Sequence, residues 1–426
     1  MWYDKIVQIF KVEELRNKIL FVLGVFVVFR LMANIPIPII EIERLQEFFA
    51  NSQVFGLLNV FTGGALSKLS IVMLGIGPYI TSVIIMQLLT MIFPRLERLY
   101  KEEGQQGKQK FNQYGRYLTV PLAFLQGFGM LTLLQRRGAI GNLGILQMLS
   151  ALTTAAAGTM FLVWLGELIS EKGIGNGVSL LIFAGIIARF PSNMQQLVVG
   201  WDPSQIPSYL AFFIISVLII AGVVIVNEAK RNIPVSYSKR VKGRKVYGGS
   251  STYLPLSVNP AGVIPIIFAL AILLFPGMLS SMLSGVGNEI ISNAAQALGA
   301  FFQNPWVYNI FYFLLVSMFT YFYTSVTFDP NSIADNLKKM GGFIPGIRPG
   351  ESTTEYLYFV LYRVLPFGAV FLASIAIMPS IIAAITGVQS FQFLVGGTSV
   401  LIVVSVVLES MRQVKSQLQM REYETF

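Results

Sequence analysis

The chain has 426 residues, of which 54% are hydrophobic and only 12% are charged, whereas soluble domains average about 25% charged residues. This composition excludes an ordinary globular enzyme and indicates a polytopic membrane protein, because the apolar residues gather in blocks of about 20, the length that one helix needs to cross a bilayer. The absence of Cys and His excludes disulfides, thiol nucleophiles, Ser-His-Asp triads and the usual zinc and haem ligands, so we expect no enzyme, metal or cofactor.

Ten apolar segments separated by polar residues predict an all-α protein with ten transmembrane helices. An even number of spans places both termini on one side of the membrane, and ten spans divide into two halves of five, the second inverted relative to the first. We place the N-terminal half at residues 19–190, the C-terminal half at 191–413 and a cytoplasmic tail at 414–426. The predicted spans are residues 19–40, 69–93, 116–135, 147–170, 177–190, 208–227, 259–280, 305–328, 355–380 and 394–412.

Basic residues are distributed unequally between the two sides of the membrane. The net charge is +10, and the side with the termini carries 25 of the 31 Lys and Arg residues. Cytoplasmic loops of membrane proteins carry an excess of Lys and Arg, so both termini are predicted to be cytoplasmic. Arg30 lies inside the first span, where its long side chain can reach the nearer interface.

Two segments flank the first span. Residues 1–18 mix apolar and basic side chains, as an interfacial amphipathic helix does, and a short frayed tail is the equal alternative. Residues 54–67 are apolar but too short to cross a bilayer, and glycines interrupt them. A re-entrant segment fits this pattern and implies a cavity around it. The alternative is a loop that lies on the outer surface.

Spans 2 and 5 each carry two isoleucines four residues apart, which lie on one face of a helix. By itself this pattern is weak evidence for a functional role, because such isoleucine pairs in membrane helices more often contact lipid or pack against other helices. Polar residues in spans 2 and 7 are likewise usually satisfied by ordinary hydrogen bonds between helices. The isoleucines are Ile76, Ile80, Ile182 and Ile186, and the polar residues are Thr81, Ser82, Gln87 and Asn259.

Two predicted cytoplasmic loops, residues 228–258 and 329–354, are longer than a connection between helices needs. The second loop contains a Gly- and Pro-rich run at residues 341–350, which predicts a folded turn that presents Arg348. The first contains a basic cluster that either reflects the positive-inside distribution alone or docks a partner. This cluster consists of Lys239, Arg240, Lys242, Arg244 and Lys245.

The middle of the predicted spans is nearly free of ionisable residues. Glu167, Arg363 and Glu409 lie toward the cytoplasmic ends of their spans. Ion-coupled carriers usually keep ionisable residues near the midplane, so the pattern counts against a secondary transporter of a small solute, which is the alternative function. A third class, a membrane-embedded enzyme such as a lipid-linked transferase, is disfavoured because the chain has no His and only four Asp.

Seven motifs, taken in order, resemble the bacterial SecY family, whose members are the pore subunits of the Sec protein-conducting channel. They run from the segment between spans 1 and 2 into span 10, so the resemblance covers nearly the whole chain. The motifs are NVFTGGALS at residues 59–67, LGIGPYI at 74–80, GIGNG at 173–177, AGVIP at 261–265, ADNLKK at 334–339, FIPGIRPG at 343–350 and GGTS at 396–399.

The resemblance implies two five-helix halves around a central hourglass pore, with a re-entrant plug and an apolar constriction. Such a channel passes unfolded secretory preproteins across the bacterial inner membrane. The implied constriction ring consists of Ile76, Ile80, Ile182, Ile186, Ile267 and Ile402, and the implied plug contains Leu57, Leu58, Val60, Phe61, Gly63 and Gly64.

The resemblance also implies a lateral gate between spans 2 and 7 that releases membrane segments into lipid. Its residues here are Thr81, Ser82, Gln87, Asn259 and Phe275. The basic cluster of the first loop and Arg348 correspond to the surface on which the family docks the ribosome or the SecA motor ATPase. The implied partners are therefore SecA, the ribosome, the small membrane subunits SecE and SecG, signal-bearing preproteins and membrane lipid.

Overall fold

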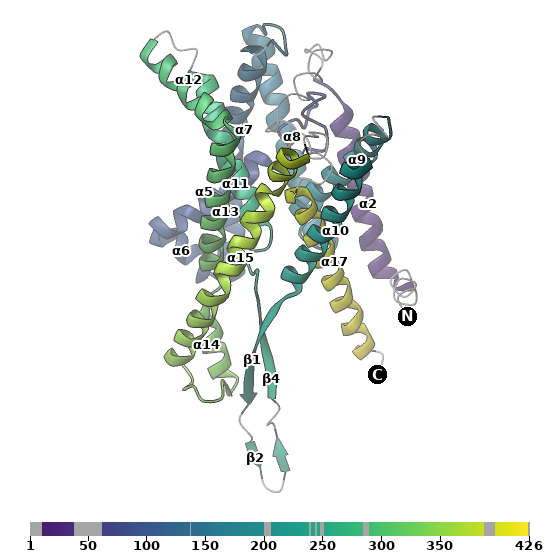
Figure 1. The fold of residues 1–426 in the computed structure, drawn as a ribbon. Coiled ribbons are helices and arrows are strands. Elements are labelled where there is room, and N and C mark those ends of the chain that lie inside the picture. Colours follow the sequence, from purple (N-terminus) through teal and green to yellow (C-terminus); the bar gives the residue numbers. More distant parts are fainter. Residues whose placement is uncertain are drawn as a thin grey trace.

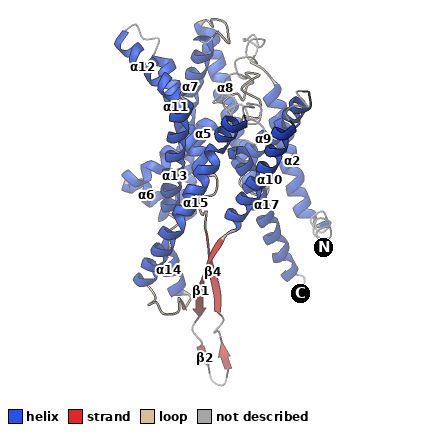
Figure 2. Ribbon diagram, viewed as in Figure 1, coloured by secondary structure: helices blue, strands red, loops and turns tan. Residues whose placement is uncertain are grey.

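Long helices make up most of the computed structural model, and a hairpin of strands projects from one end of the helix bundle (Figures 1 and 2). The first turn of α2 and the last turn of α17 lie at this same end (Figure 1). The structure describes residues 11–37, 62–136, 138–199, 206–237, 240–242, 245–247, 251–283, 289–386 and 397–424.

The helices follow the predicted spans. Each of the ten predicted spans overlaps one helix, and α6, α12 and α14 are additional. Among the described residues, five helices are by themselves long and apolar enough to cross a bilayer, or six when the bent pair α5 and α6 is counted as one span. Ten membrane crossings therefore stay a prediction. The helices are α2 (Glu13–Asn34), α5 (Gly77–Ile92), α6 (Pro94–Lys101), α7 (Gly104–Arg136), α8 (Ile145–Lys172), α9 (Gly177–Val199), α10 (Ile206–Glu228), α11 (Ile264–Leu283), α12 (Glu289–Gln303), α13 (Pro305–Thr327), α14 (Pro330–Lys339), α15 (Glu351–Thr386) and α17 (Gly397–Glu424).

Several helix ends differ from the predicted boundaries for local chemical reasons. Helix α2 begins at Glu13, before the predicted start at residue 19, and its first turn carries two acidic residues that favour the positive end of the helix dipole. Helix α17 continues to Glu424, through the predicted tail. Helix α5 begins only at Gly77, because residues 62–76 form turns rather than the start of a span.

A sharp bend separates α5 from α6. The two helices are inclined by 111°, and Phe93 between them has an extended backbone. Pro94 explains the bend, because a proline disfavours the helical conformation of the residue before it. The second predicted span therefore ends at this bend, and the short helix α6 follows it at an angle to α5.

The two predicted cytoplasmic loops contain regular structure that the sequence did not indicate. In the first loop, β1 pairs antiparallel with β4 to make a hairpin, and β2 pairs with β3. Residues 329–354 form α14 and β5, and β5 adds to the other edge of β1. The strands are β1 (Lys230–Tyr237), β2 (Arg240–Lys242), β3 (Lys245–Tyr247), β4 (Ser251–Ser257) and β5 (Gly342–Phe343).

A small apolar core joins the hairpin to the second loop. Ile233 and Val235 alternate along β1 and are 1% exposed, as expected for the inward face of a strand. They pack in one cluster with Leu337 of α14, Ile344 and Leu357 of α15. The two loops are thus one folded unit, which holds the Gly- and Pro-rich run in place.

Candidate functional site

Six isoleucines from different helices belong to one continuous cluster of apolar side chains. Ile402 is fully buried within it, Ile76 and Ile182 are nearly so, and the other three are partly buried and pack against it. The structure therefore brings into one cluster residues that are far apart in the sequence. They come from the start of α5, from α9, from α11 and from α17: Ile76, Ile80, Ile182, Ile186, Ile267 and Ile402.

Helix packing and a local turn explain how these side chains come to lie in the same apolar cluster. Helix α5 packs against α11, and α9 packs against α17. Ile76 is the residue immediately before α5, and Pro78 lies in the first turn of that helix, where the missing N–H of proline costs no hydrogen bond. Among the described residues, the buried polar side chains are Ser, Thr, Asn and Gln, and none carries a formal charge.

A turn at residues 62–67, here called the plug turn, lies against the cluster beside α9. Gly63 and Gly64 have positive φ angles of 66° and 89°, which favour glycine. A Cβ added at Gly63 would lie 2.9 Å from Cα of Gly185, so two backbones touch here. The other predicted plug residues, Leu57, Leu58, Val60 and Phe61, lie outside the described residues.

Two arginines contact the plug turn. Arg30 of α2 donates a hydrogen bond from Nη1 to the carbonyl oxygen of Gly63 at 2.7 Å. Arg189 of α9 donates from Nη2 to Oγ of Ser67 at 3.4 Å. The sequence predicted that Arg30 reaches toward an interface, and the structure instead provides a specific acceptor. A charged residue inside an apolar span is itself a signal of function, and this signal could have singled out Arg30.

Two of the predicted gate residues form hydrogen bonds with α7 rather than with α11. Ser82 donates to the carbonyl oxygen of Gly115, and Thr81 accepts from Nε2 of Gln126 at 3.1 Å. Both contacts join α5 to α7 within the N-terminal half. They are the interhelical hydrogen bonds that polar residues in membrane helices usually make.

The other predicted gate residues differ in their surroundings. Phe275 of α11 is 42% exposed. Oε1 of Gln87 and Oδ1 of Asn259 are buried and have no hydrogen-bond partner among the described residues. Other buried polar atoms among the described residues, in α7, α8 and α13, also have no partner, so this feature does not single out the predicted gate.

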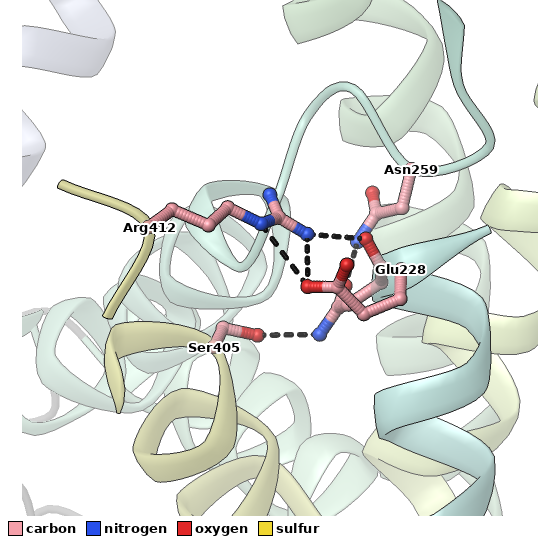
Figure 3. Close-up of polar contacts among 5 residues, drawn as sticks. Glu228, Asn259, Ser405 and Arg412 are labelled. Carbon is pink, nitrogen blue, oxygen red and sulfur yellow. Dashed lines mark hydrogen bonds and ion pairs between the residues drawn. The ribbon is translucent and has the colours of Figure 1, made fainter. Parts of the chain in front are cut away.

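Asn259 belongs to a polar network that the sequence did not reveal (Figure 3). Its Nδ2 donates to Oδ1 of Asn227 at 3.0 Å, and Nδ2 of Asn227 donates to Oγ of Ser405 at 2.7 Å. Arg412 adds an ion pair with Glu228. The network therefore connects the end of α10, the segment before α11 and the helix α17.

The docking residues that were predicted in the two loops lie on the projecting unit. Arg348 is exposed on a folded turn, in which the N–H of Ile347 bonds to the carbonyl of Ile344 at 3.0 Å and Thr353 Oγ1 donates to the carbonyl of Arg348 at 2.9 Å. In the basic cluster, the backbone of Arg240, Lys242 and Lys245 lies in β2 and β3, while Lys239 and Arg244 lie outside the described residues.

Comparisons with known proteins agree with this architecture. The family model described as SecY matches residues 70–411. The protein translocase subunit SecY of Streptomyces coelicolor is 44% identical over 442 residues, with 98% of each chain covered. The corresponding subunit of Mycobacterium tuberculosis is 41% identical over 434 residues, with 97% of each chain covered.

Solved structures share the fold at lower sequence identity. A structure of a protein-conducting channel superposes with a TM-score of 0.64 at 21% identity, covering 93% of this chain and 91% of that chain. Sec61 in a canine ribosome-channel complex from the endoplasmic reticulum gives a TM-score of 0.61 at 20% identity, with the same coverage.

Proposed function

The chain belongs to the SecY family of protein translocase subunits, and on that premise we propose that its isoleucine cluster is the constriction of the pore through which unfolded preproteins cross the membrane. The family consists of channel subunits rather than enzymes. The observation that supports the proposal is that six isoleucines from four separate segments lie in one apolar cluster or pack against it. We call these six residues the isoleucine ring.

The chemistry of the isoleucine ring suits a seal that must also let a chain pass. A narrow apolar constriction sheds water and so blocks ions. Isoleucine offers a translocating peptide no hydrogen bond and no charge, so a passing segment finds no strong binding site. The uncharged character of the buried polar residues that the structure describes supports a passive pore rather than an ion-coupled carrier.

We propose further that the plug turn seals one side of the ring and that α5 and α11 form the lateral gate. A signal sequence opens the gate when its apolar segment enters the seam, because each Leu or Ile gains about 0.3–0.6 kcal/mol in lipid. The hydrophobicity of the substrate therefore drives opening. Membrane segments leave through the same seam into lipid.

The hairpin and the Arg348 turn are proposed as the docking surface for the SecA motor or the ribosome. Both lie on the unit that projects from the end of the bundle where α2 begins and α17 ends (Figure 1). Arginine can donate paired hydrogen bonds to a carboxylate or to an RNA phosphate. This proposal places the termini in the cytoplasm, the protein in the bacterial inner membrane and SecE and SecG beside it as small membrane subunits.

A reconstitution experiment tests this function. The purified chain with its small subunits is placed in vesicles with SecA, ATP and a signal-bearing preprotein, and protease is then added outside. Protection of the preprotein that depends on ATP and on the signal is the expected result. A preprotein without its signal and vesicles without the chain are the controls. Full digestion of the preprotein in every sample would contradict the proposal.

A further inference from the structure

The plug turn is held by side chains from two helices that approach from different directions. Arg30 of α2 bonds to the carbonyl of Gly63 at 2.7 Å, and Arg189 of α9 bonds to Ser67 at 3.4 Å. The Arg189 guanidinium also lies over Gly64, because a Cβ added there would be 3.1 Å from its Nε. The two cations therefore contact both ends of the turn.

Hydrogen bonds within the plug turn contribute to its shape. The N–H of Ala65 bonds to the carbonyl of Thr62 at 3.2 Å, the N–H of Leu66 bonds to Oγ1 of Thr62 at 3.3 Å, and Ser67 Oγ donates to the carbonyl of Gly64 at 3.0 Å. These bonds satisfy part of the turn's backbone locally, while the carbonyl oxygens of Gly63, Ala65 and Leu66 accept from Arg30, Ser70 and Leu69 outside it.

Residues 69–71, here called the foot, are attached in a different way. The N–H of Ile37 bonds to the carbonyl of Leu69 at 2.9 Å, and the N–H of Ile71 bonds to the carbonyl of Ile35 at 3.0 Å. The foot also lies against Gly158 of α8, where an added Cβ would clash with the carbonyl of Ile71. Leu69 and Ser70 are 0% exposed. Two backbone bonds also join the turn to the foot, from the N–H of Leu69 to the carbonyl of Leu66 at 3.1 Å and from the N–H of Ser70 to the carbonyl of Ala65 at 2.9 Å. Moving the foot would break its pairing with residues 35–37, whereas moving the turn breaks the two arginine contacts and these two bonds.

We propose that Arg30 and Arg189 form a latch that holds the plug turn closed, and that the turn opens about the fixed foot. The inference rests on the proposed function, in which this turn belongs to the plug. Each guanidinium is partly withdrawn from water and is compensated by an oxygen of the turn, and hydrogen bonds from a charged donor are stronger than neutral ones. The latch therefore favours the closed state.

Cysteine labelling can follow the plug turn and the foot separately, because the chain has no native Cys. Thr62 in the turn and Ser70 in the foot are both buried, and each is close in size to Cys. We would place Thr62→Cys or Ser70→Cys in the full-length complex in vesicles. The probe is a maleimide that cannot cross the membrane, applied at the side on which the turn faces water, and the measurement is the labelling rate.

Each cysteine is then combined with Arg30→Gln or Arg189→Gln. We expect roughly a tenfold or greater rise in the labelling rate at residue 62 and continued protection at residue 70, because the loss of one charged hydrogen bond is worth about that factor. Arg136→Gln at the end of α7 is the matched control, since it removes one positive charge predicted for the same side of the membrane. This control should leave both rates unchanged.

Three results would overturn the latch. The rate at residue 62 could stay unchanged in both arginine variants, it could rise equally in Arg136→Gln, or it could rise together with the rate at residue 70. Arg30→Lys, which keeps the charge and a donor, should fall between wild type and Arg30→Gln, and a rate equal to Arg30→Gln would also contradict the proposal. Labelling requires no transport, so failure of the latch is distinguishable from failure of protease protection in the wild-type channel.

Discussion

Arg412 of α17 pairs with Glu228, the last residue of α10, through contacts of 3.1 Å from Nε and 2.6 Å from Nη2 to the same Oε1 atom. Its Nη2 also donates to the carbonyl of Asn227 at 2.9 Å. The strand β1 begins two residues later, at Lys230. The base of the projecting hairpin is therefore attached to the helix that carries Ile402, and Figure 3 shows Asn259 at the same place.

The first prediction compares two members of this network. Arg412→Gln should lower the free energy of unfolding by no more than about 1 kcal/mol, because both partners are 45% exposed and such pairs contribute little. Asn227→Ala should cost about 1–3 kcal/mol, because its amide bonds to Ser405 and Asn259 at once. Unfolding of the purified protein in detergent measures both. If Arg412→Gln lowered the free energy of unfolding more than Asn227→Ala, the ion pair rather than the Asn227 amide would be the stronger contribution, and the prediction would be wrong.

The second prediction concerns the docking turn. Arg348→Glu should abolish motor-driven translocation and leave membrane insertion and assembly with the small subunits intact, because it reverses the charge of an exposed side chain on a rigid turn. Lys339→Glu at the end of α14 makes the same charge reversal on the same projecting unit and serves as the control. Translocation rates equal to wild type in Arg348→Glu would show that this arginine does not couple the motor.

The third prediction concerns the isoleucine ring. Ile402→Asn places an amide in an apolar constriction, so it should favour hydration, increase ion conductance in planar bilayers and let preproteins with weak signals pass. Leu401→Asn is the matched control, because Leu401 is equally buried in the same cluster but is not one of the predicted ring residues. If both variants conduct ions equally, the effect comes from loosened packing and Ile402 has no special role.

The fourth prediction concerns the lateral gate. If Thr81 of α5 and Phe275 of α11 face the same seam, Thr81→Cys with Phe275→Cys should form a disulfide in the closed gate, which requires a Cα separation of roughly 4.4–6.8 Å. Oxidation should then stop preprotein transport, and reduction should restore it. Met91→Cys with Phe275→Cys is the control, because Met91 is exposed and lies ten residues further along α5 than Thr81, about 15 Å at 1.5 Å per residue. Efficient crosslinking with undiminished transport would refute the gate.

Local chemistry was sufficient to predict the helices of the ten apolar segments, but not α6, α12 and α14. Each predicted span overlaps a helix, because an apolar run of about 20 residues satisfies its backbone within one helix whatever its neighbours are. The exposed Arg348 turn was likewise predictable from its Gly and Pro residues. The isoleucine pairs were visible on helix faces, but their meaning came from resemblance to a family rather than from spacing.

Contacts between distant segments could not be predicted in this way. No feature of the sequence near β1 predicts that β5 pairs with it. Pro234 within β1 would even argue against a central strand, because proline cannot donate a backbone hydrogen bond. The turns at residues 69–76, where the second span was expected to begin, depend on backbone bonds to residues 35–37 and on the close approach of α8.

The sequence by itself determined that this protein is a helical membrane protein with an uneven distribution of charge, because composition and hydropathy act on each segment independently. Only the tertiary structure decided that Arg30 and Arg189 share one turn, that Asn259 joins α10 and α17, and that six isoleucines occupy one cluster. These relationships depend on how the helices pack, and packing is set by the shapes of many side chains at once.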